Sequence, residues 1–332
     1  MTTRIQHHRM MTMLQVFVLV LVLGGLFLAA GCSEDQCVTC VEPVILAPTQ
    51  VYSVSGDGQV TLYWNDYPEI YSTDVAKYTI WSRYYHADDE NDPDRTFEYI
   101  AEVLVGENYD AATGQYYFVD DLVTNAIDFE YAVSAVSSDG RESYLSFEFV
   151  VDTPLPMSET ALTLFDYAGS NRDLSGFDFS LAGEHGSYEG NGADGVVDPT
   201  TDNSTADVYV EFDPSGVPWL KTTRDDIHVQ DYGTFLDNDG QLYFEGVSWA
   251  PEYGWSESGV LELITGHIYV VEIYHEPSAG DIHYAKLGVT DVDNANGFVK
   301  IHWAYQLVNG LPELSAPEPR ESEDSESQAI RL

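Results

Sequence analysis

The sequence is poor in basic residues. Its 332 residues include 13 lysines and arginines against 56 aspartates and glutamates, which gives a formal net charge of −43. Proteins that bind nucleic acids neutralise the phosphates with lysine and arginine, and basic segments also attach proteins to anionic membrane surfaces. The composition therefore excludes nonspecific nucleic-acid binding and electrostatic attachment to a membrane. Because the acids are dispersed along the chain, we favour a solvated acidic surface over capture of divalent cations.

The sequence also lacks the short motifs of common catalytic sites. It contains no G-x-S-x-G, no H-E-x-x-H and no phosphate-binding glycine loop. Among the many carboxylates, spacing singles out no pair as the two acids of a glycoside hydrolase. We therefore expect a non-enzymatic protein with no catalytic residue and no resident cofactor.

The N-terminal apolar run is shorter than the roughly 20 residues of a membrane-spanning helix. It extends from Val16 to Ala30 and follows a segment that contains Arg4 and Arg9 and no acid. A basic segment, a short apolar core and small residues before a cleavage point are typical of an export signal. We predict a signal peptide over residues 1–31, with an uncleaved anchor as the alternative.

The residues around Cys32 resemble the lipobox of bacterial lipoproteins. Cys32 follows Ala-Ala-Gly, although the lipobox usually has leucine where this sequence has Ala29. The resemblance implies that Cys32 is acylated and becomes the mature N-terminus, so that the protein is attached to a membrane of the bacterial cell envelope by its lipid. Ser33 stands where an inner-membrane retention signal has aspartate, which favours the outer membrane. The alternative is an ordinary signal peptide with a coincidental cysteine.

The other two cysteines form the pair Cys37-Val-Thr-Cys40. A C-x-x-C pair can be a redox site, half of a zinc site, a haem attachment site or a small disulfide loop. Val41 stands where haem attachment requires histidine, and no second pair completes a zinc site. For an exported protein we favour a disulfide between Cys37 and Cys40.

Composition and patterning predict an all-β protein. Tyrosine is abundant, with 23 residues, turn-forming residues recur about every ten positions, and no segment has a convincing helical period. Composition shifts divide the chain into six parts. These are the signal peptide (1–31), a lipid-anchored stalk (32–47), a first β domain (48–153), a linker (154–160), a second β domain (161–314) and a disordered acidic tail (315–332).

The first β domain contains Trp64, the Tyr78–Ile80 strand and the regular strand Phe129-Glu-Tyr-Ala-Val-Ser-Ala-Val136. These features carry a resemblance to a fibronectin type III domain. It implies an immunoglobulin-like sandwich that acts as a spacer or interaction module. The hydroxyl of the family's tyrosine corner would fall at Phe129, which predicts the loss of one hydrogen bond, on the order of 1 kcal/mol.

Alternating apolar residues predict antiparallel strands in the second domain, which we expect to form a β-sandwich or a partly closed barrel. The expected strands are Ala206–Phe212, Gln241–Trp249, Val260–Ile264, His267–His275, His283–Thr290 and Val299–Leu307. The last three resemble the closing strands of HmuY-like envelope lipoproteins, whose type member captures haem. The resemblance implies haem capture as an alternative function.

Two histidines flank a predicted turn of the second domain. His275 and His283 have the side-chain parity of apolar neighbours, which places them at the margin of an apolar face as cross-strand neighbours. With Glu276 and Asp281 they would supply imidazole and carboxylate ligands for haem or a divalent metal such as zinc. The alternative interpretation is a pair of polar residues that end a hairpin.

An aromatic loop is the candidate for a glycan-binding platform. Trp249, Tyr253 and Trp255 surround a proline and a glycine and lie beside acids. Aromatic rings stack on sugar rings, but they also cap the edges of sandwiches. Both interpretations stay open from the sequence.

An acidic loop of the first domain is the candidate for calcium. Asp88, Glu90, Asp92 and Asp94 place carboxylates at alternate positions, without the glycine of an EF-hand loop. A solvated interstrand loop is the alternative. Taken together, the sequence favours a surface-binding or structural module whose ligand is an extracellular or periplasmic protein or glycan, with haem or metal capture as the alternative.

Overall fold

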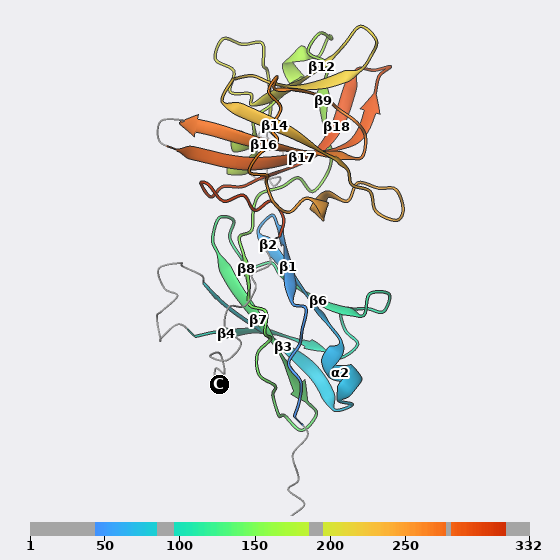
Figure 1. Ribbon diagram of the computed structural model, residues 1–332, viewed down its shortest axis with the longest axis vertical. Coiled ribbons are helices and arrows are strands. Elements are labelled where there is room, and N and C mark those ends of the chain that lie inside the picture. The colour runs from blue at the N-terminus through green and yellow to red at the C-terminus, as the bar shows by residue number, and fades with distance from the viewer. Residues whose placement is uncertain (1–43, 85–95, 186–194, 277–279, 317–332) are drawn as a thin grey trace, which may run out of the picture. The chain divides into compact units, whose positions relative to one another are not determined.

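The computed structural model describes residues 44–84, 96–185, 195–276 and 280–316 (Figure 1). Residues from Ile45 onward form one compact unit. The signal peptide, Cys32, Cys37, Cys40 and the calcium candidates Asp88, Glu90, Asp92 and Asp94 lie outside the described residues, so these predictions stay predictions. Within the described ranges, no helix has the length and apolar character needed to cross a membrane.

The N-terminal half of this unit is a sandwich of two antiparallel sheets. One sheet contains, in order, β1 (Tyr52–Gly56), β2 (Gln59–Asn65), β6 (Gln115–Asp120) and β5 (Tyr109–Asp110). The other contains, in order, β4 (Glu98–Leu104), β3 (Val75–Tyr84), β7 (Phe129–Ser137) and β8 (Val150–Asp152), and helix α2 (Tyr67–Tyr71) lies between β2 and β3 in the chain. The predicted immunoglobulin-like sandwich is confirmed.

Alternation along β2 separates the core of this sandwich from its outer surface. Val60, Leu62 and Trp64 are fully buried in the core, as their spacing predicts. Thr61 and Tyr63 point to the opposite face, because successive side chains of a strand alternate between its two sides. Trp64 is among the largest fully buried side chains and packs against the rings of Tyr78 and Tyr116, at centroid distances of 5.5 and 5.9 Å.

The C-terminal half is a second sandwich of two five-stranded antiparallel sheets. One contains, in order, β11 (Val196–Val197), β10 (Gly176–Phe177), β12 (Val208–Phe212), β13 (Pro218–Thr222) and β15 (Val260–Glu262). The other contains, in order, β14 (Ile227–Thr234), β16 (His267–Glu276), β17 (Asp281–Asp293), β18 (Phe298–Tyr305) and β9 (Leu162–Phe165). The short elements are η2 (Arg172–Leu174), α3 (Phe179–His185) and η3 (Phe244–Gly246). In the described residues both sheets are open, so of the two predicted forms the sandwich is correct and the partly closed barrel is not.

The predicted strand Gln241–Trp249 does not form. The segment instead contains the 3-10 turn η3, with single β-bridges at Leu242 and Trp249. The carbonyl oxygens of Phe244 and Val247 both accept hydrogen bonds from the Nζ atom of Lys286, at 2.9 Å, so they do not pair with a neighbouring strand. This turn carries one wall of the candidate site.

The hydrogen bond expected to be lost at Phe129 is made two residues further along β7. Tyr131 is fully buried, and its hydroxyl donates to Asp120 Oδ2 at 3.0 Å. Phe129 packs against the rings of Tyr84 and Tyr131 without a hydroxyl of its own.

The Tyr131 hydrogen bond generates a stability prediction. Tyr131→Phe should lower the free energy of unfolding by about 2 kcal/mol, because a buried hydrogen bond to a carboxylate is lost. Urea denaturation measures the change. Tyr144→Phe is the matched control, since the Tyr144 side chain is 66% exposed and should tolerate the loss of its hydroxyl. Equal effects of the two substitutions would contradict the assignment.

Candidate functional site

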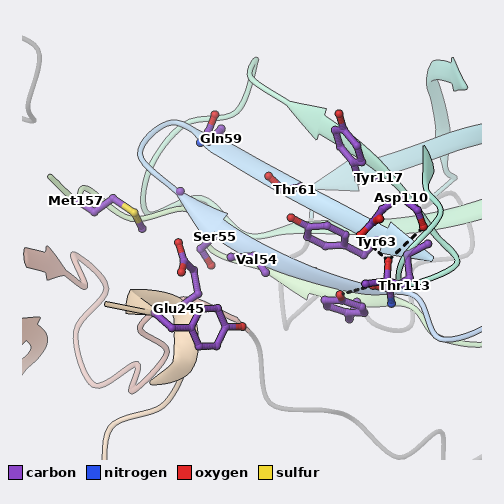
Figure 2. A pocket seen from close by; sticks show the side chains of 14 residues that line it. Val54, Ser55, Gln59, Thr61, Tyr63, Asp110, Thr113, Tyr117, Met157 and Glu245 are labelled. Carbon is purple, nitrogen blue, oxygen red and sulfur yellow. Dashed lines mark hydrogen bonds between the residues drawn. The ribbon is translucent and has the colours of Figure 1, made fainter. Parts of the chain in front are cut away.

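A groove of about 460 Å³ lies against the outer face of the sheet formed by β1, β2, β6 and β5 (Figure 2). Strands β1 and β2 supply one part of its lining, and the residues from Asp110 to Tyr117 supply another. Met157, Tyr243 and Glu245 complete it from the second half of the unit. The lining consists of Tyr52, Val54, Ser55, Gly56, Gln59, Thr61, Tyr63, Asp110, Thr113, Gln115, Tyr117, Met157, Tyr243 and Glu245.

Three tyrosines form a row across the strands of this sheet. In the strand register Tyr63 lies opposite Tyr52 on one side and Tyr117 on the other. The rings of Tyr52 and Tyr63 are stacked, with centroids 5.0 Å apart and planes inclined by 13°. The Tyr117 ring is 6.4 Å from that of Tyr63 and tilted by 39°. Because the row extends across three strands, its ring positions are fixed by backbone pairing rather than by loops.

Burial favours the neutral phenol at Tyr52 and at Tyr63. The Tyr52 hydroxyl donates to Gln115 Oε1 at 3.2 Å. Burial raises the pKa of Tyr52 and of Tyr63, and the neighbouring Tyr52 raises that of Tyr63 further. At neutral pH Tyr52 and Tyr63 therefore present hydroxyl groups that can both donate and accept hydrogen bonds.

Asp110, one of the two acids in the lining, accepts hydrogen bonds from residues of its own turn. Its Oδ1 accepts from the backbone N–H of Ala112 at 2.8 Å, and its Oδ2 accepts from Thr113 Oγ1 at 2.9 Å. The Ala112 hydrogen bond, followed by that of Thr113, lowers the pKa of Asp110. This carboxylate therefore shapes the β5–β6 turn and stays ionised.

The opposite wall is the η3 turn with Tyr243 and Glu245. Tyr243 is half exposed, and Glu245 is exposed. Lys286 holds the turn from below. Its side chain is fully buried, donates to the Phe244 and Val247 carbonyls, and lies 4.4 Å from the centroid of the Phe244 ring. Burial lowers the pKa of Lys286 to about 7.

The groove carries no positive charge. None of the lining residues is lysine, arginine or histidine. Two of them, Asp110 and Glu245, are acids, and the whole chain is strongly acidic. Repulsion therefore disfavours phosphorylated, sulfated or carboxylated ligands, whereas neutral polar groups can bond to the tyrosine hydroxyls and to the amides of Gln59 and Gln115.

The structure brings His275 and His283 together, as the sequence predicts. Their ring centroids are 5.3 Å apart. His275 Nε2 is 3.0 Å from the Tyr305 hydroxyl, while His283 Nδ1 is 2.9 Å from the Gln306 carbonyl and its Nε2 is 3.2 Å from Asp281 Oδ1. Burial, followed by the proximity of His283, lowers the pKa of His275. The ring nitrogens named here thus already have protein partners.

The metal and haem hypothesis for these histidines stays a prediction. Glu276 pairs with Asp281 at the end of the β16–β17 hairpin, which is the strand arrangement the hypothesis requires. Within the described residues, no group of three or more histidine, cysteine or acidic side chains is arranged to hold a metal ion.

The three aromatic residues of the predicted loop lie in different environments. Tyr253 is 80% exposed, whereas Trp255 packs against the cluster around Val247 and Ile268 and lies 6.4 Å from the His228 ring. Trp249 forms a β-bridge with Glu313. Among the ring contacts of the described residues, none joins two of the three predicted aromatics. A platform in this loop stays a prediction.

Sequence reasoning did not identify the groove. The alternation of β2 correctly places Tyr63 on the outer face, and this was the available signal. The register that aligns Tyr52, Tyr63 and Tyr117 depends on which strands pair, and the η3 wall lies about 180 residues further along the chain than β2. The periodicity of a single segment predicts neither which strands pair nor which distant segment forms the wall.

Comparisons with known proteins support no narrower assignment. No family model and no curated protein matches the chain. An Fn3-like protein from Clostridium thermocellum is similar at 20% identity, covering 32% of this chain and 91% of that chain, with a TM-score of 0.23. The third fibronectin III domain of the human KIAA0343 protein is similar at 15% identity, covering 33% and 83%, with a TM-score of 0.24. The FN1–FN3 domains of chicken CNTN1 are similar at 12% identity, covering 78% and 68%, with a TM-score of 0.28. The two sandwiches are therefore assigned from their own strand order.

The buried lysine under the groove wall generates a prediction. Lys286→Met should lower the free energy of unfolding by about 2 kcal/mol, because the carbonyls of Phe244 and Val247 lose the amine that donates to both. Chemical denaturation measures the loss. Lys300→Met is the control, because the Lys300 side chain is 45% exposed and should contribute little. An unchanged stability for Lys286→Met would show that the amine does not support the wall.

Proposed function

We propose that this protein is a non-enzymatic binding module and that the tyrosine-lined groove binds a neutral, hydroxyl-rich glycan. The observation that carries the proposal is the row of Tyr52, Tyr63 and Tyr117 on rigid strands, faced by Tyr243 and Glu245 (Figure 2). The proposal keeps the ligand class that the loop of Trp249, Tyr253 and Trp255 suggested as an alternative, but assigns it to a different surface.

The chemistry of the lining supports a sugar ligand. Sugar rings offer apolar C–H faces and many hydroxyls, which match partly exposed aromatic rings and neutral hydrogen-bonding groups. Tyr52 and Tyr117 are 42% and 39% exposed. Gln59, Thr61 and Gln115 add neutral donors and acceptors between the rings. The absence of basic residues from the lining disfavours acidic glycans.

A proline-rich peptide is the main competing occupant. Aromatic grooves bind the extended polyproline helix, which has few hydrogen-bonding groups. In this groove the side chains of Gln59 and Thr61 would lose their solvation without gaining hydrogen-bond partners from such a peptide. A polyol gives them partners, so the lining favours the glycan.

Binding to a panel of neutral hexasaccharides tests the proposal. We expect the folded protein to bind at least one neutral glucan, mannan or xylan fragment by isothermal titration calorimetry. Tyr117→Ala should weaken that binding at least tenfold, because we expect the loss of a partly exposed ring of the contact surface to cost more than about 1.4 kcal/mol. Tyr144→Ala is the matched control, since Tyr144 is exposed and is not among the groove residues.

Two outcomes would overturn the glycan assignment. One is the absence of binding to every neutral hexasaccharide at millimolar concentration. The other is tight binding of a proline-rich peptide that Tyr117→Ala abolishes, which would assign the groove to peptides. Thermal unfolding of each variant shows whether its fold is intact.

We also propose that the binding module is attached to the bacterial envelope by lipid on Cys32. The proposal rests on the basic segment, apolar run and Ala-Ala-Gly-Cys sequence at the N-terminus. In cells grown with radiolabelled palmitate, the full-length protein should incorporate label into the membrane fraction, and Cys32→Ala should abolish incorporation. Cys37→Ala is the matched control and should be labelled like the wild type. Mass spectrometry that finds an unmodified Cys32 would contradict the anchor.

A further inference from the structure

Two buried carboxyl groups meet at one serine hydroxyl beside the groove. Asp152 is fully buried and Glu313 is 4% exposed. Ser55 Oγ is 2.9 Å from Asp152 Oδ1 and 3.1 Å from Glu313 Oε1. Ser55 also belongs to the groove lining. The cluster is therefore a buried acid pair in contact with the candidate site.

Proton counting shows that this pair needs one proton of its own. A serine hydroxyl has a single hydrogen and donates to one acceptor at a time. If Ser55 donates to one carboxylate, its second contact is a hydrogen bond only when the other carboxyl carries a proton and donates to Oγ. With both carboxylates ionised and Ser55 donating to Asp152, Glu313 Oε1 would face the serine lone pairs and keep only the long hydrogen bond from the Thr153 N–H, at 3.4 Å.

The surroundings of the pair do not supply a compensating positive charge. The charged and titratable groups that face it are Asp128 and Tyr131. Asp128 accepts a hydrogen bond from Thr153 Oγ1 at 2.8 Å, and its charge disfavours ionisation of both acids. In the part of the chain that the structure describes, no lysine or arginine forms an ion pair with Asp152 or Glu313, and the buried Asp152 Oδ2 has no hydrogen-bond partner.

Glu313 begins a short segment that joins the groove wall to strand β1. The Ser55 N–H donates to the Ser315 carbonyl at 2.6 Å. On its other side the segment holds the wall, because the Ser315 hydroxyl lies within hydrogen-bonding distance of the Glu245 carbonyl at 3.1 Å and the Leu314 N–H donates to the Ser248 carbonyl at 2.8 Å. Residues 313–315 therefore lie between the strand with the tyrosines and the turn with Tyr243 and Glu245.

We propose that Asp152 and Glu313 share a proton through Ser55, and that loss of this proton releases residues 313–315 and opens the groove. The two negative charges then repel each other in a site without a counter-charge, and Glu313 reaches water by leaving. The Ser55–Ser315 hydrogen bond and the attachment of the η3 wall are lost with it. The groove would thus be closed at acidic to neutral pH and open in alkali.

The direction of the pH dependence follows from burial. Burial raises the pKa of Asp152 to about 7, and burial together with the charge of Asp152 raises that of Glu313 to about 8. In the unfolded chain both acids ionise near pH 4. The stabilisation of the closed form is complete below that pH and is lost as the pH rises through the folded-state values. Release is therefore expected between about pH 6 and pH 9.

Hydrogen exchange in the ligand-free protein tests the release. After correction for the intrinsic base-catalysed rate, protection of the Ser55 and Leu314 amides should fall at least tenfold between pH 6 and pH 9. The Gly266 amide, which donates to Val289 at 2.7 Å in the second sandwich, serves as the internal reference. Glu313→Gln should keep Ser55 and Leu314 protected at both pH values, because an amide resembles a protonated carboxyl in shape and carries its own donor.

Matched variants keep the test decisive. Glu159→Gln makes the same change at an exposed position and should retain the wild-type pH profile. Asp152→Asn removes the other acid and should also suppress the fall in protection, which provides a second route if Glu313→Gln does not fold. Identical pH profiles for the wild type and for the folded pair variants would overturn the proposal, as would a fall in protection of equal size at Gly266.

The effect on ligand binding rests on the proposed function and is measured separately. Affinity for the neutral hexasaccharide should fall at least tenfold between pH 6 and pH 9 in the wild type and stay constant in Glu313→Gln. If the exchange data show release but no glycan binds at any pH, the release stands and the glycan assignment fails. If glycan binds with the same affinity at both pH values while Ser55 and Leu314 stay protected, the release is refuted and the binding site stands.

Discussion

The shortage of cations decides how this fold accommodates its carboxylates. With 56 acids and 13 bases, most acids have no lysine or arginine available to them. Several surface acids are stabilised by hydrogen bonds within their own turns instead of by cations. Asp110, Asp213 and Asp293 accept hydrogen bonds from residues of their own turns, which lowers the pKa of each. Such acids define the tight connections between strands without long-range ion pairs. Some buried acids do pair with a cation, as Glu130 does with Arg83. Asp152 and Glu313 form no such pair in the described residues, and a serine hydroxyl lies between them instead.

Lys286, one of the few basic residues, donates hydrogen bonds to backbone carbonyls and not to a carboxylate. It lies in the core under η3 and bonds to backbone carbonyls, although many carboxylates elsewhere remain without a basic partner. The lysine thereby holds an irregular turn that has no strand pairing of its own. As a result, the groove has one wall made by the sheet and one wall anchored by a single amine and by the segment that begins at Glu313. The sheet wall is rigid, whereas the η3 wall depends on a few polar contacts.

The sequence predicted the sandwiches because their signal is local. Alternation along β2 assigns Val60, Leu62 and Trp64 to the core, and no other part of the chain is needed for that inference. It could not predict the groove, because Tyr52, Tyr63 and Tyr117 meet through strand pairing. The contact between Ser55 and Glu313 joins residues 258 positions apart, and neither has a distinctive neighbourhood in the sequence. Gln241–Trp249 was predicted as a strand because its pattern suits one, while a buried lysine from another strand determines its actual form.

Because Asp152 and Glu313 are buried, the proposed proton switch should respond to salt and pH differently from the exposed carboxylates of this acidic protein. Repulsion among exposed carboxylates is screened by salt over a Debye length of about 10 Å at 0.1 M. The pair at Ser55 is shielded from solvent, so added salt reduces its repulsion much less. Surface repulsion would loosen the whole molecule gradually and be relieved by salt, whereas ionisation of Asp152 and Glu313 acts at one segment over a narrow pH range. In the proposed switch, an acidic protein with few cations uses a proton, rather than an ion pair, to hold its groove closed.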